Sequence, residues 1–323
     1  MFEAEPGTIE DALDMQAASP SKQRLFHLHW EHAVYERQTE PKPIERFLNQ
    51  LDSFRAAGGK VIWTIHNLSP HDESKRGSNN DLQKGLLELA DVLHLHSLPA
   101  LAAAKAKLNL PGRKIRVIPH QNYTGAYPFF VREVARESLG LPEAGMIALC
   151  PGRIAPYKQP NELIEAFLAI AKANDRLIIA GHTEKDLEIE LPEDNRLVYR
   201  NGFATPEEVG KLHAAADFIV LPYRASLTSG SAILAATLGR AVLGPDTPGL
   251  RDVVEQESTG LLYQPGNLHG ALRVALGTDA KTWAERGRAA AHASAARDAV
   301  IVASAWHDVM TTLVAPVCRP RGT

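Results

Sequence analysis

The fold follows from one stretch, Leu221-Pro222-Tyr223-Arg224-Ala225-Ser226-Leu227-Thr228-Ser229-Gly230-Ser231, which joins an apolar run to an alanine- and leucine-rich segment. The run before it, 217–220, is typical of a buried strand, and the segment after it, 232–239, is typical of a helix. The junction therefore predicts exposed backbone amides and small hydroxyl side chains at a helix start. Those amides and the positive helix end attract phosphate, and Gly230 allows its close approach. The alternative is an ordinary capped helix, since Thr and Ser are common cap residues.

A second loop places two cations after another strand. Gly152, Arg153 and Lys158 follow the apolar run 146–150 and precede the helical pattern 162–167. An arginine can grip a diphosphate with two parallel hydrogen bonds, and a lysine adds a point charge. Loops at the carboxyl ends of parallel strands are where such sheets bind ligands. The two loops together favour a diphosphate site.

Length and composition indicate a soluble globular protein of two domains. The chain has 323 residues, of which 45% are hydrophobic and 23% charged, and its net charge is −3. That charge argues against a general nucleic-acid binder. Cys150 and Cys318 are far apart and outside any metal-binding spacing, which favours reduced thiols and a cytoplasmic location. No apolar run approaches the roughly 18 residues of a membrane span, and residues 1–21 do not read as a signal peptide.

Apolar strand patterns alternate with helical patterns in the first half of the chain, which predicts an α/β fold with a parallel sheet wound on both faces. We expect strands at 25–30, 60–65, 90–96 and 113–119, and helices at 9–17, 43–57, 81–89 and 99–108. Two glycines and a proline in 139–145 indicate an interdomain linker. We therefore expect one domain over 1–143 and a second over 144–298. The region 282–313 is expected to be helical, with a break near 295–298.

Motifs between Met146 and Leu262 resemble, in order and spacing, the donor-binding domain of GT-B glycosyltransferases, and among these the GT4-like group. The matching pieces are Gly152-Arg153 with Lys158, 177–181, 201–203 with 206–209, 216–223, 239–242 and 260–263. The resemblance implies two Rossmann-like doubly wound domains that face a cleft, with a shortened N-terminal domain. It also implies that a final helix, about 299–323, packs back on that domain.

The resemblance implies that the second domain binds a nucleotide-diphosphate sugar as donor. It assigns the donor diphosphate to Arg153, Lys158, Thr228, Ser229, Gly230 and Ser231. It places near the nucleotide and sugar Gly152, Gly181, Phe203, Tyr223 and Ser226. This sequence departs from the family where its two usual glutamates align, because Ser226 and Leu234 stand there. Their absence leaves open the identity of the sugar, the ribose contacts and the choice between retaining and inverting transfer.

Polar loops after the first-domain strands form the predicted acceptor and catalytic side, since such loops build the sites of this sheet type. We expect catalytic roles for His66, Glu31, Asp72 and His120. We expect acceptor contacts from Trp30, Asn67, His71, Asn122 and Tyr123. A histidine can shuttle protons or stabilise charge near neutral pH. For each histidine a capping or core role is the alternative.

Alternating histidines on two strands raise the question of a metal site. His27 with His29, and His94 with His96, each point to one face of a strand. No cysteine joins them, and the resemblance implies catalysis without a bound metal. We therefore expect no metal and no other cofactor.

The resemblance implies a glycosyltransferase that moves a sugar from a nucleotide-diphosphate sugar to a saccharide or lipid-linked acceptor, with retention of configuration. The stretches 63–72 and 118–123 further resemble bacterial enzymes that build exopolysaccharide or lipid-linked oligosaccharide. Two alternatives stay open: a nucleotide-sugar epimerase or hydrolase, and a non-catalytic member that binds a nucleotide sugar or a partner subunit. A lipid-linked acceptor would bring the protein to the inner face of the membrane, and an uncovered sheet edge would favour a homo-oligomer.

Overall fold

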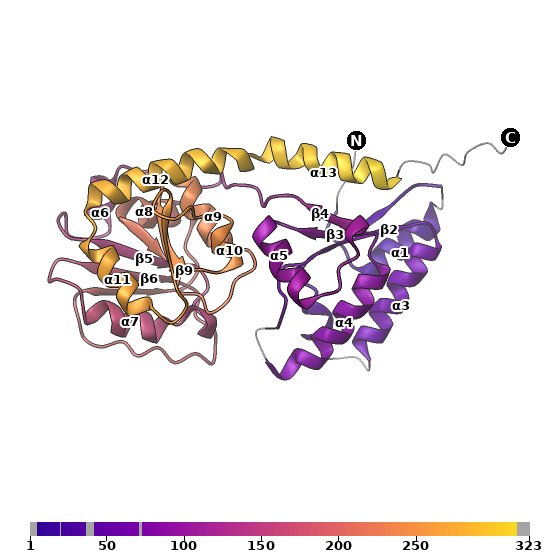
Figure 1. The fold of residues 1–323 in the computed structure, drawn as a ribbon, viewed down its shortest axis with the longest axis horizontal. Helices are drawn as coiled ribbons and strands as arrows, with labels where there is room; N and C mark the ends of the chain where they lie inside the picture. Colours follow the sequence, from indigo (N-terminus) through magenta and orange to yellow (C-terminus); the bar gives the residue numbers. More distant parts are fainter. Residues whose placement is uncertain (1–4, 20, 37–41, 71–72, 315–323) are drawn as a thin grey trace. The chain divides into compact units, whose positions relative to one another are not determined.

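The computed structural model describes residues 5–19, 21–36, 42–70 and 73–314 of the chain. Its contacts divide the chain into two compact units, Met1–Pro119 with Val300–Thr323, and His120–Ala299. Among the described residues, four strands form a sheet in the first unit and six form a sheet in the second (Figure 1). None of the helices in these described ranges is both long and apolar enough to cross a bilayer.

The first unit has a parallel sheet whose strands follow one another in chain order, β1-β2-β3-β4. The strands are β1 (Leu25–Leu28), β2 (Lys60–Thr64), β3 (Val92–Leu95) and β4 (Ile115–Val117). The helical segments are α1 (Ile9–Ala18), α2 (Ala33–Glu36), α3 (Pro43–Ala56), η1 (Glu73–Lys75), α4 (Arg76–Leu89), α5 (Leu98–Lys107) and η2 (Gly112–Lys114). Because crossovers between parallel strands are right-handed, strands added in one direction carry their linking helices on one face. Phe26 of β1 meets Phe54 of α3 on that face, with ring centroids 6.4 Å apart.

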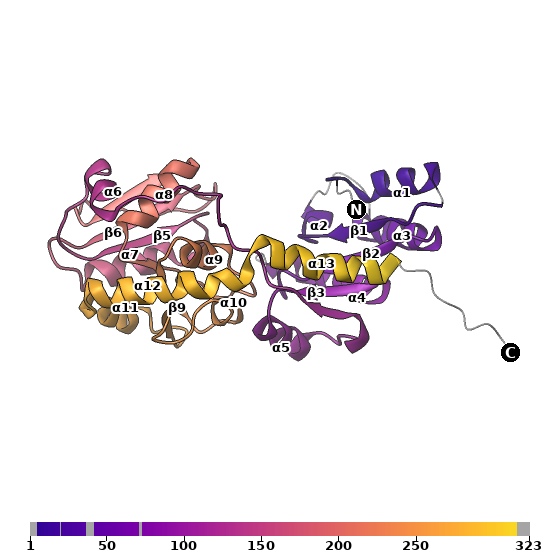
Figure 2. The ribbon, with the colours of Figure 1, turned by 90° about the horizontal axis from the view of Figure 1, so that it is seen from above.

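The opposite face of this sheet is covered by the last helix of the chain. Helix α13 (Ala299–Val314), drawn in yellow, lies over the strands in both views (Figures 1 and 2). The ring of Trp306 is 4.8 Å from that of His27 and 4.6 Å from that of His94, centroid to centroid. A short 3₁₀ turn, η4 (Ala295–Arg297), precedes α13 at the predicted break. The final helix therefore belongs to the first unit.

The second unit has a six-stranded parallel sheet in the order β10-β9-β8-β5-β6-β7. The strands are β5 (Ile147–Pro151), β6 (Arg176–Gly181), β7 (Leu197–Asn201), β8 (Phe218–Val220), β9 (Ala241–Pro245) and β10 (Gly260–Tyr263). The helical segments are α6 (Arg132–Ser138), η3 (Pro156–Lys158), α7 (Pro160–Leu168), α8 (Pro206–Ala215), α9 (Gly230–Thr237), α10 (Pro248–Arg251), α11 (Leu268–Gly277) and α12 (Ala280–Ser294). The chain builds outward from β5 in one direction and then from β8 in the other. This reversal puts connecting helices on both faces, as in a Rossmann sheet.

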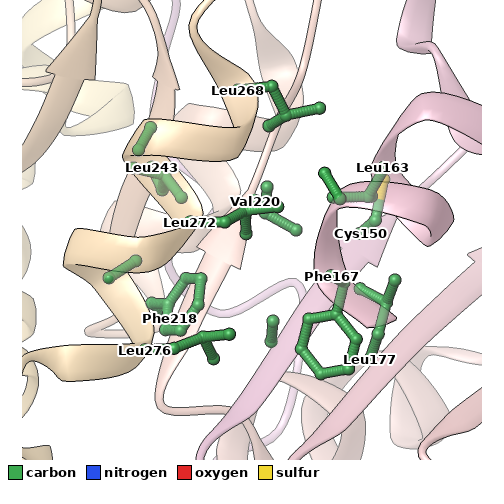
Figure 3. Packing of buried hydrophobic residues seen from close by; sticks show 14 of the residues in the cluster. Cys150, Leu163, Phe167, Leu177, Phe218, Val220, Leu243, Leu268, Leu272 and Leu276 are labelled. Atoms are coloured by element: carbon green, nitrogen blue, oxygen red, sulfur yellow. The ribbon is translucent and has the colours of Figure 1, made fainter. Parts of the chain in front are cut away.

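The core of the second unit lies on both faces of its sheet. On one face, Phe167 of α7 and Leu272 of α11 pack against Leu177, Phe218 and other strand residues, all of them buried (Figure 3). The other face is covered by small and aliphatic residues of α8 and α9, of which Leu212, Ala232 and Ala235 are buried. Small residues let α9 approach the strands closely, which fixes the position of its first turn.

The contacts divide the units at 119/120 rather than at the expected 143/144. Arg136 explains why, because its guanidinium donates to the carbonyls of Pro142, Glu143 and Gly145 and to Asp217 at the start of β8. The glycines and proline of 139–145 thus form a turn held inside the second unit. Breaker residues mark a change of direction, and they do not distinguish a turn from a linker. His120, Asn122 and Tyr123 were expected in the first domain, and they lie in the second unit.

Candidate functional site

The point at which strand order reverses selects one place on the second sheet. β5 and β8 are neighbours there, and the chain leaves them toward opposite edges of the sheet. In open α/β sheets ligands bind at this switch point, outside the carboxyl ends of the strands. The two loops that follow these strands are 151–158 and 221–229, which hold the residues expected to bind a diphosphate.

Lys158 is a buried cation in this loop. Its side chain belongs to a residue only 3% exposed, and its Nζ donates to the carbonyl of Pro151 at 2.8 Å. The ammonium lies 5.5 Å from the ring centroid of Tyr223. Within the described ranges, no carboxylate forms an ion pair with it. Burying an ammonium without a counter-ion is costly, so the position is suited to an anion supplied from outside the chain.

The start of α9 lies beside this lysine. A Cβ built on Gly152 would come 3.2 Å from Lys158 Nζ and 3.4 Å from Ser231 Oγ, so the two loops converge at Gly152. Ser229 caps the helix by accepting from the amide of Ala232 at 3.2 Å. The amides of Gly230 and Ser231 precede the first intrahelical hydrogen bond, from Ile233 to Ser229. A buried cation and free amides therefore meet at one point.

Two further features complete the surroundings of this point. A Cβ on Gly181, whose φ is +155°, would lie 2.0 Å from the carbonyl oxygen of Gly152, so no side chain fits there. The hydroxyl of Tyr123 lies 2.9 Å from the Cβ position of Gly230. Sequence reasoning assigned Tyr123 to the acceptor side. Its place beside α9 depends on where the chain crosses between the units, which no local pattern reveals.

The other expected donor residues take different positions. Arg153 is exposed and pairs with Glu184, with 2.8 Å between Nη2 and Oε1. Phe203 is 91% exposed and stacks on His182, with ring centroids 5.0 Å apart. Ser226 donates from its hydroxyl to the carbonyl of Thr228 at 3.1 Å. The structure thus brings together Gly152, Lys158, Tyr223 and the start of α9, and directs Arg153 to a carboxylate.

Five histidines of the first unit gather on one face of its sheet, where α13 covers part of them; we call them the histidine cluster. They are His27, His29, His66, His94 and His96. Register accounts for this, because His94 pairs with Thr64 and His27 with Ile62, and every second residue along a strand shares a face. Among the described residues, no group of three or more His, Cys, Asp or Glu has the geometry to hold a metal ion.

Hydrogen bonds fix the protonation of the inner histidines. His94 Nε2 faces the carbonyl of Ile118 at 2.9 Å, so Nε2 carries the proton and Nδ1 accepts from Thr64 Oγ1 at 2.9 Å. Thr64 in turn accepts from His27 Nε2 at 2.7 Å. Burial lowers the pKa of both His27 and His94 to about 3. Both imidazoles are therefore neutral at pH 7, in a chain of hydrogen bonds with one direction.

The outer histidines lie beside an aromatic side chain with an unusual backbone. His29 Nδ1 and His66 Nε2 are 2.9 Å apart, and the indole of Trp30 stacks on His66 at 4.1 Å between centroids. Trp30 has φ +56° and is 50% exposed. A bulky residue in the left-handed region is an outlier of the kind found at ligand sites. Glu31 is buried beside Trp63, and burial raises the pKa of its carboxyl group.

The remaining expected residues are scattered. The carbonyl of Asn67 accepts from Gln83 Nε2 at 3.3 Å, and His120 Nδ1 lies 2.7 Å from the carbonyl of Gln121. His71 and Asp72 lie outside the described residues. Sequence reasoning named His29 only as one of an alternating pair. His29 lies one residue past the end of β1 and His66 two residues past the end of β2, so the pair forms where two neighbouring strands end.

Known structures share this architecture. Sucrose-phosphate synthase from Thermosynechococcus elongatus superposes with a TM-score of 0.73 at 20% identity, over 94% of this chain and 77% of that one. Anabaena HepE, solved in complex with UDP, gives 0.70 at 15% identity, over 94% of this chain and 82% of that one. At such identities the likeness shows the fold alone. The chain has the GT-B fold of glycosyltransferases.

Sequence comparison finds a family match in the second unit. Residues 145–277 match the family described as glycosyl transferases group 1. The D-inositol 3-phosphate glycosyltransferase of Jonesia denitrificans is 29% identical over 202 residues, 57% of this chain and 46% of that protein. The GDP-mannose:glycolipid 4-beta-D-mannosyltransferase of Xanthomonas campestris pv. campestris is 22% identical over 272 residues, 81% of this chain and 73% of that protein. The family match lies within the second unit, and the chain spans about half the length of the first of these relatives.

Proposed function

We propose that this protein transfers a sugar from a nucleoside-diphosphate sugar, and that the second unit binds the donor's diphosphate between Lys158 and the start of α9. The observation that carries the proposal is the burial of Lys158 without an ion-paired carboxylate among the described residues. HepE, which shares the fold, was solved with UDP and with UDP-glucose, and this supports a nucleotide donor here.

The chemistry of the site suits a departing diphosphate. Negative charge grows on the diphosphate as its bond to the anomeric carbon of the sugar breaks. A fixed ammonium and backbone amides at a helix start stabilise such charge without reorganising, and more strongly where water is excluded. We propose that Lys158 and the amides of Gly230 and Ser231 fill the role that a metal ion fills in other transferases. Transfer would then be metal-independent.

The family's glutamate positions need a separate account. Ser226 uses its hydroxyl on Thr228, and Leu234 has no polar group, so neither offers a carboxylate to the sugar or ribose. We propose that transfer retains the anomeric configuration, as the family resemblance implies. A non-catalytic protein that binds a nucleotide sugar is the second candidate, and the loss of both carboxylates is the observation that favours it.

We propose that the acceptor binds the first unit near Trp30, Glu31 and His66. The half-exposed indole of Trp30 offers an apolar face to the C–H groups of a sugar ring, and the histidines beside it can bind hydroxyl groups. The Xanthomonas relative is named for a glycolipid acceptor, which supports a lipid-linked saccharide. Such an acceptor would bring a cytoplasmic protein to the inner face of the membrane.

Nucleotide binding tests the donor site directly. UDP, GDP, ADP and TDP, and their common sugar conjugates, are added singly while thermal unfolding is followed. A ligand that binds only the folded state raises the midpoint by mass action. Lys158→Met should weaken the binding of the nucleoside diphosphate by at least about 100-fold, because the negative charge of the diphosphate would lose its buried cationic partner. Lys172→Met, at an exposed lysine, is the matched control.

The outcomes separate the candidates. If no nucleotide shifts the midpoint, the donor site is wrong. If Lys158→Met binds as well as the natural protein, the diphosphate lies elsewhere. Binding without release of the sugar, in the presence of saccharide and lipid-linked acceptors, would favour the non-catalytic candidate. Release of free sugar into water alone would favour a hydrolase.

A further inference from the structure

Tyr123 is held against the first turn of α9 by contacts on both sides. Its amide donates to Thr237 Oγ1 at 3.2 Å, near the end of the same helix. The preceding Asn122 is buried, its amide donates to the carbonyl of Arg297, and its side chain donates to that of Ser294, at 2.8 and 2.9 Å. The backbone around Tyr123 is therefore fixed to the second unit at three places. A tyrosine on such a support presents its hydroxyl in one direction.

That direction is toward Gly230. The Tyr123 hydroxyl lies 2.9 Å from where a Cβ of Gly230 would be, closer than a side chain there could tolerate. Within the described ranges, no protein group is hydrogen-bonded to this hydroxyl, although the ring lies 5.8 Å from His120 and 6.1 Å from Tyr127. Burial raises the pKa of Tyr123, so the group stays protonated and able to donate at neutral pH. A fixed donor thus faces the first turn of α9, where the amides of Gly230 and Ser231 lie.

We infer that the Tyr123 hydroxyl is a direct ligand of the donor diphosphate, donating a hydrogen bond to an oxygen of the distal phosphate at the start of α9. This rests on the proposed donor site and adds a ligand that the loop 151–158 and the helix do not supply. Gly230 then has two roles, because the missing side chain leaves room both for phosphate and for the tyrosine hydroxyl. The charge of the leaving diphosphate would be shared among an ammonium, two amides and a phenol.

Tyr123→Phe removes the hydroxyl and keeps the ring that packs beside α9. Calorimetry measures the dissociation constants of UDP, GDP, ADP and TDP and, for whichever binds, of the matching monophosphate. Loss of one neutral hydrogen bond should weaken the binding of the diphosphate by about three- to tenfold. The monophosphate should change by less than about twofold, because it lacks the distal phosphate. Tyr127→Phe, at the neighbouring ring, should change neither.

A second variant tests the contact itself. Gly230→Ala places a methyl group against the hydroxyl, and in Tyr123→Phe that clash is relieved. The cost of Gly230→Ala for diphosphate affinity should therefore be smaller in the Tyr123→Phe background than alone. Strictly additive losses would overturn the inference.

The remaining outcomes are distinct from those of the donor site. If the natural protein binds no nucleotide, both proposals are overturned. If Lys158→Met loses binding while Tyr123→Phe keeps it, the donor site stands and the role of Tyr123 is overturned. Equal losses for diphosphate and monophosphate would show that Tyr123 only supports the loop, which also overturns it.

Discussion

The two sheets are both parallel, and they differ in how they are wound. The second reverses its strand order between β5 and β8, so two loops diverge there and leave backbone amides and a buried lysine facing one point. The described strands of the first run in a single direction, so the linking helices lie on one face and the other carries histidines under α13. A reversal creates an anion site from backbone geometry. An unreversed sheet instead leaves one face free of linking helices. The chemistry of that face depends on the side chains that the strand register brings together.

The electrostatics of the two units follow the same division. The second unit buries charges, some paired, as where Arg136 meets Asp217 at 2.7 Å, and one, Lys158, without a carboxylate among the described residues. The first unit buries neutral imidazoles, because burial keeps His27 and His94 unprotonated. A buried positive charge is thus already present in the second unit. In the first unit it would have to be created by protonation.

The largest expected effect concerns the cover over the histidine cluster. Trp306→Ala removes the indole that packs on His27 and His94. Because Trp306 is half-buried, the substitution should lower the free energy of unfolding by about 2 kcal/mol. Truncating a fully buried aromatic residue costs about 3–5 kcal/mol. Hydrogen exchange in β2 and β3 should quicken by about thirtyfold, while β5 and β6 stay unchanged.

Ile301→Ala is the control for Trp306, since Ile301 lies on the same helix and is 54% exposed. It should leave exchange in both sheets within about twofold. Unchanged exchange in β2 and β3 after Trp306→Ala would mean that α13 does not cover the first sheet in solution. The contrast between a covered face and a doubly wound sheet would then fail.

How far the sequence predicts this molecule also differs between the units. In the second unit, strand β8, the loop 221–229 and the start of α9 could be predicted from the sequence. Small residues, a glycine and a cation occur there within a few positions of each other. The GT-B fold could be predicted from the order and spacing of such motifs. The break before α13 was also predicted, and the 3₁₀ turn η4 lies there.

Features that depend on distant segments could not be predicted. Helix α4 begins at Arg76, earlier than expected, because its first turn has no apolar periodicity to mark it. The position of Tyr123 depends on Thr237 and Arg297, more than a hundred residues away in the chain. The histidine cluster requires the register between strands. A pattern of alternating histidines in one strand cannot supply that register.

A smaller effect concerns how the stability contributed by buried histidines in each unit depends on pH. The pKa of His94 is about 3 in the folded protein and near 6.5 when unfolded, so below pH 6.5 the unfolded state binds more protons. Stability from this group is complete above pH 6.5 and is lost as the pH falls toward 3, at up to about 1.4 kcal/mol per pH unit. His94→Gln should remove about one proton from the slope of unfolding free energy against pH between about pH 4 and 5.5. Its amide can still donate to Ile118 and accept from Thr64.

His213 of α8 is the counterpart in the second unit. Burial lowers its pKa to about 4, and its Nδ1 donates to the carbonyl of Val209 at 2.8 Å. His213→Gln should also reduce the slope, but only down to about pH 4, whereas the effect of His94→Gln should continue toward pH 3. Urea unfolding across the pH range measures both. If both substitutions changed the slope over the same pH range, burial would lower the pKa of His94 no more than that of His213.

The smallest expected effect concerns Arg153, which the sequence assigns to the diphosphate and the structure pairs with Glu184. The two anions would compete for one guanidinium, so Glu184→Gln should free Arg153 and tighten nucleoside-diphosphate binding. An exposed ion pair contributes only about 0–1 kcal/mol, which limits the gain in affinity measured by calorimetry to about fivefold. Glu207→Gln makes the same change of charge at a surface pair with Lys211 and should leave the affinity unchanged. Equal affinities in both variants would mean that Arg153 does not reach the diphosphate, and that the switch point works through Lys158 and backbone amides. Weaker binding in Glu184→Gln would instead make Glu184 the residue that positions Arg153.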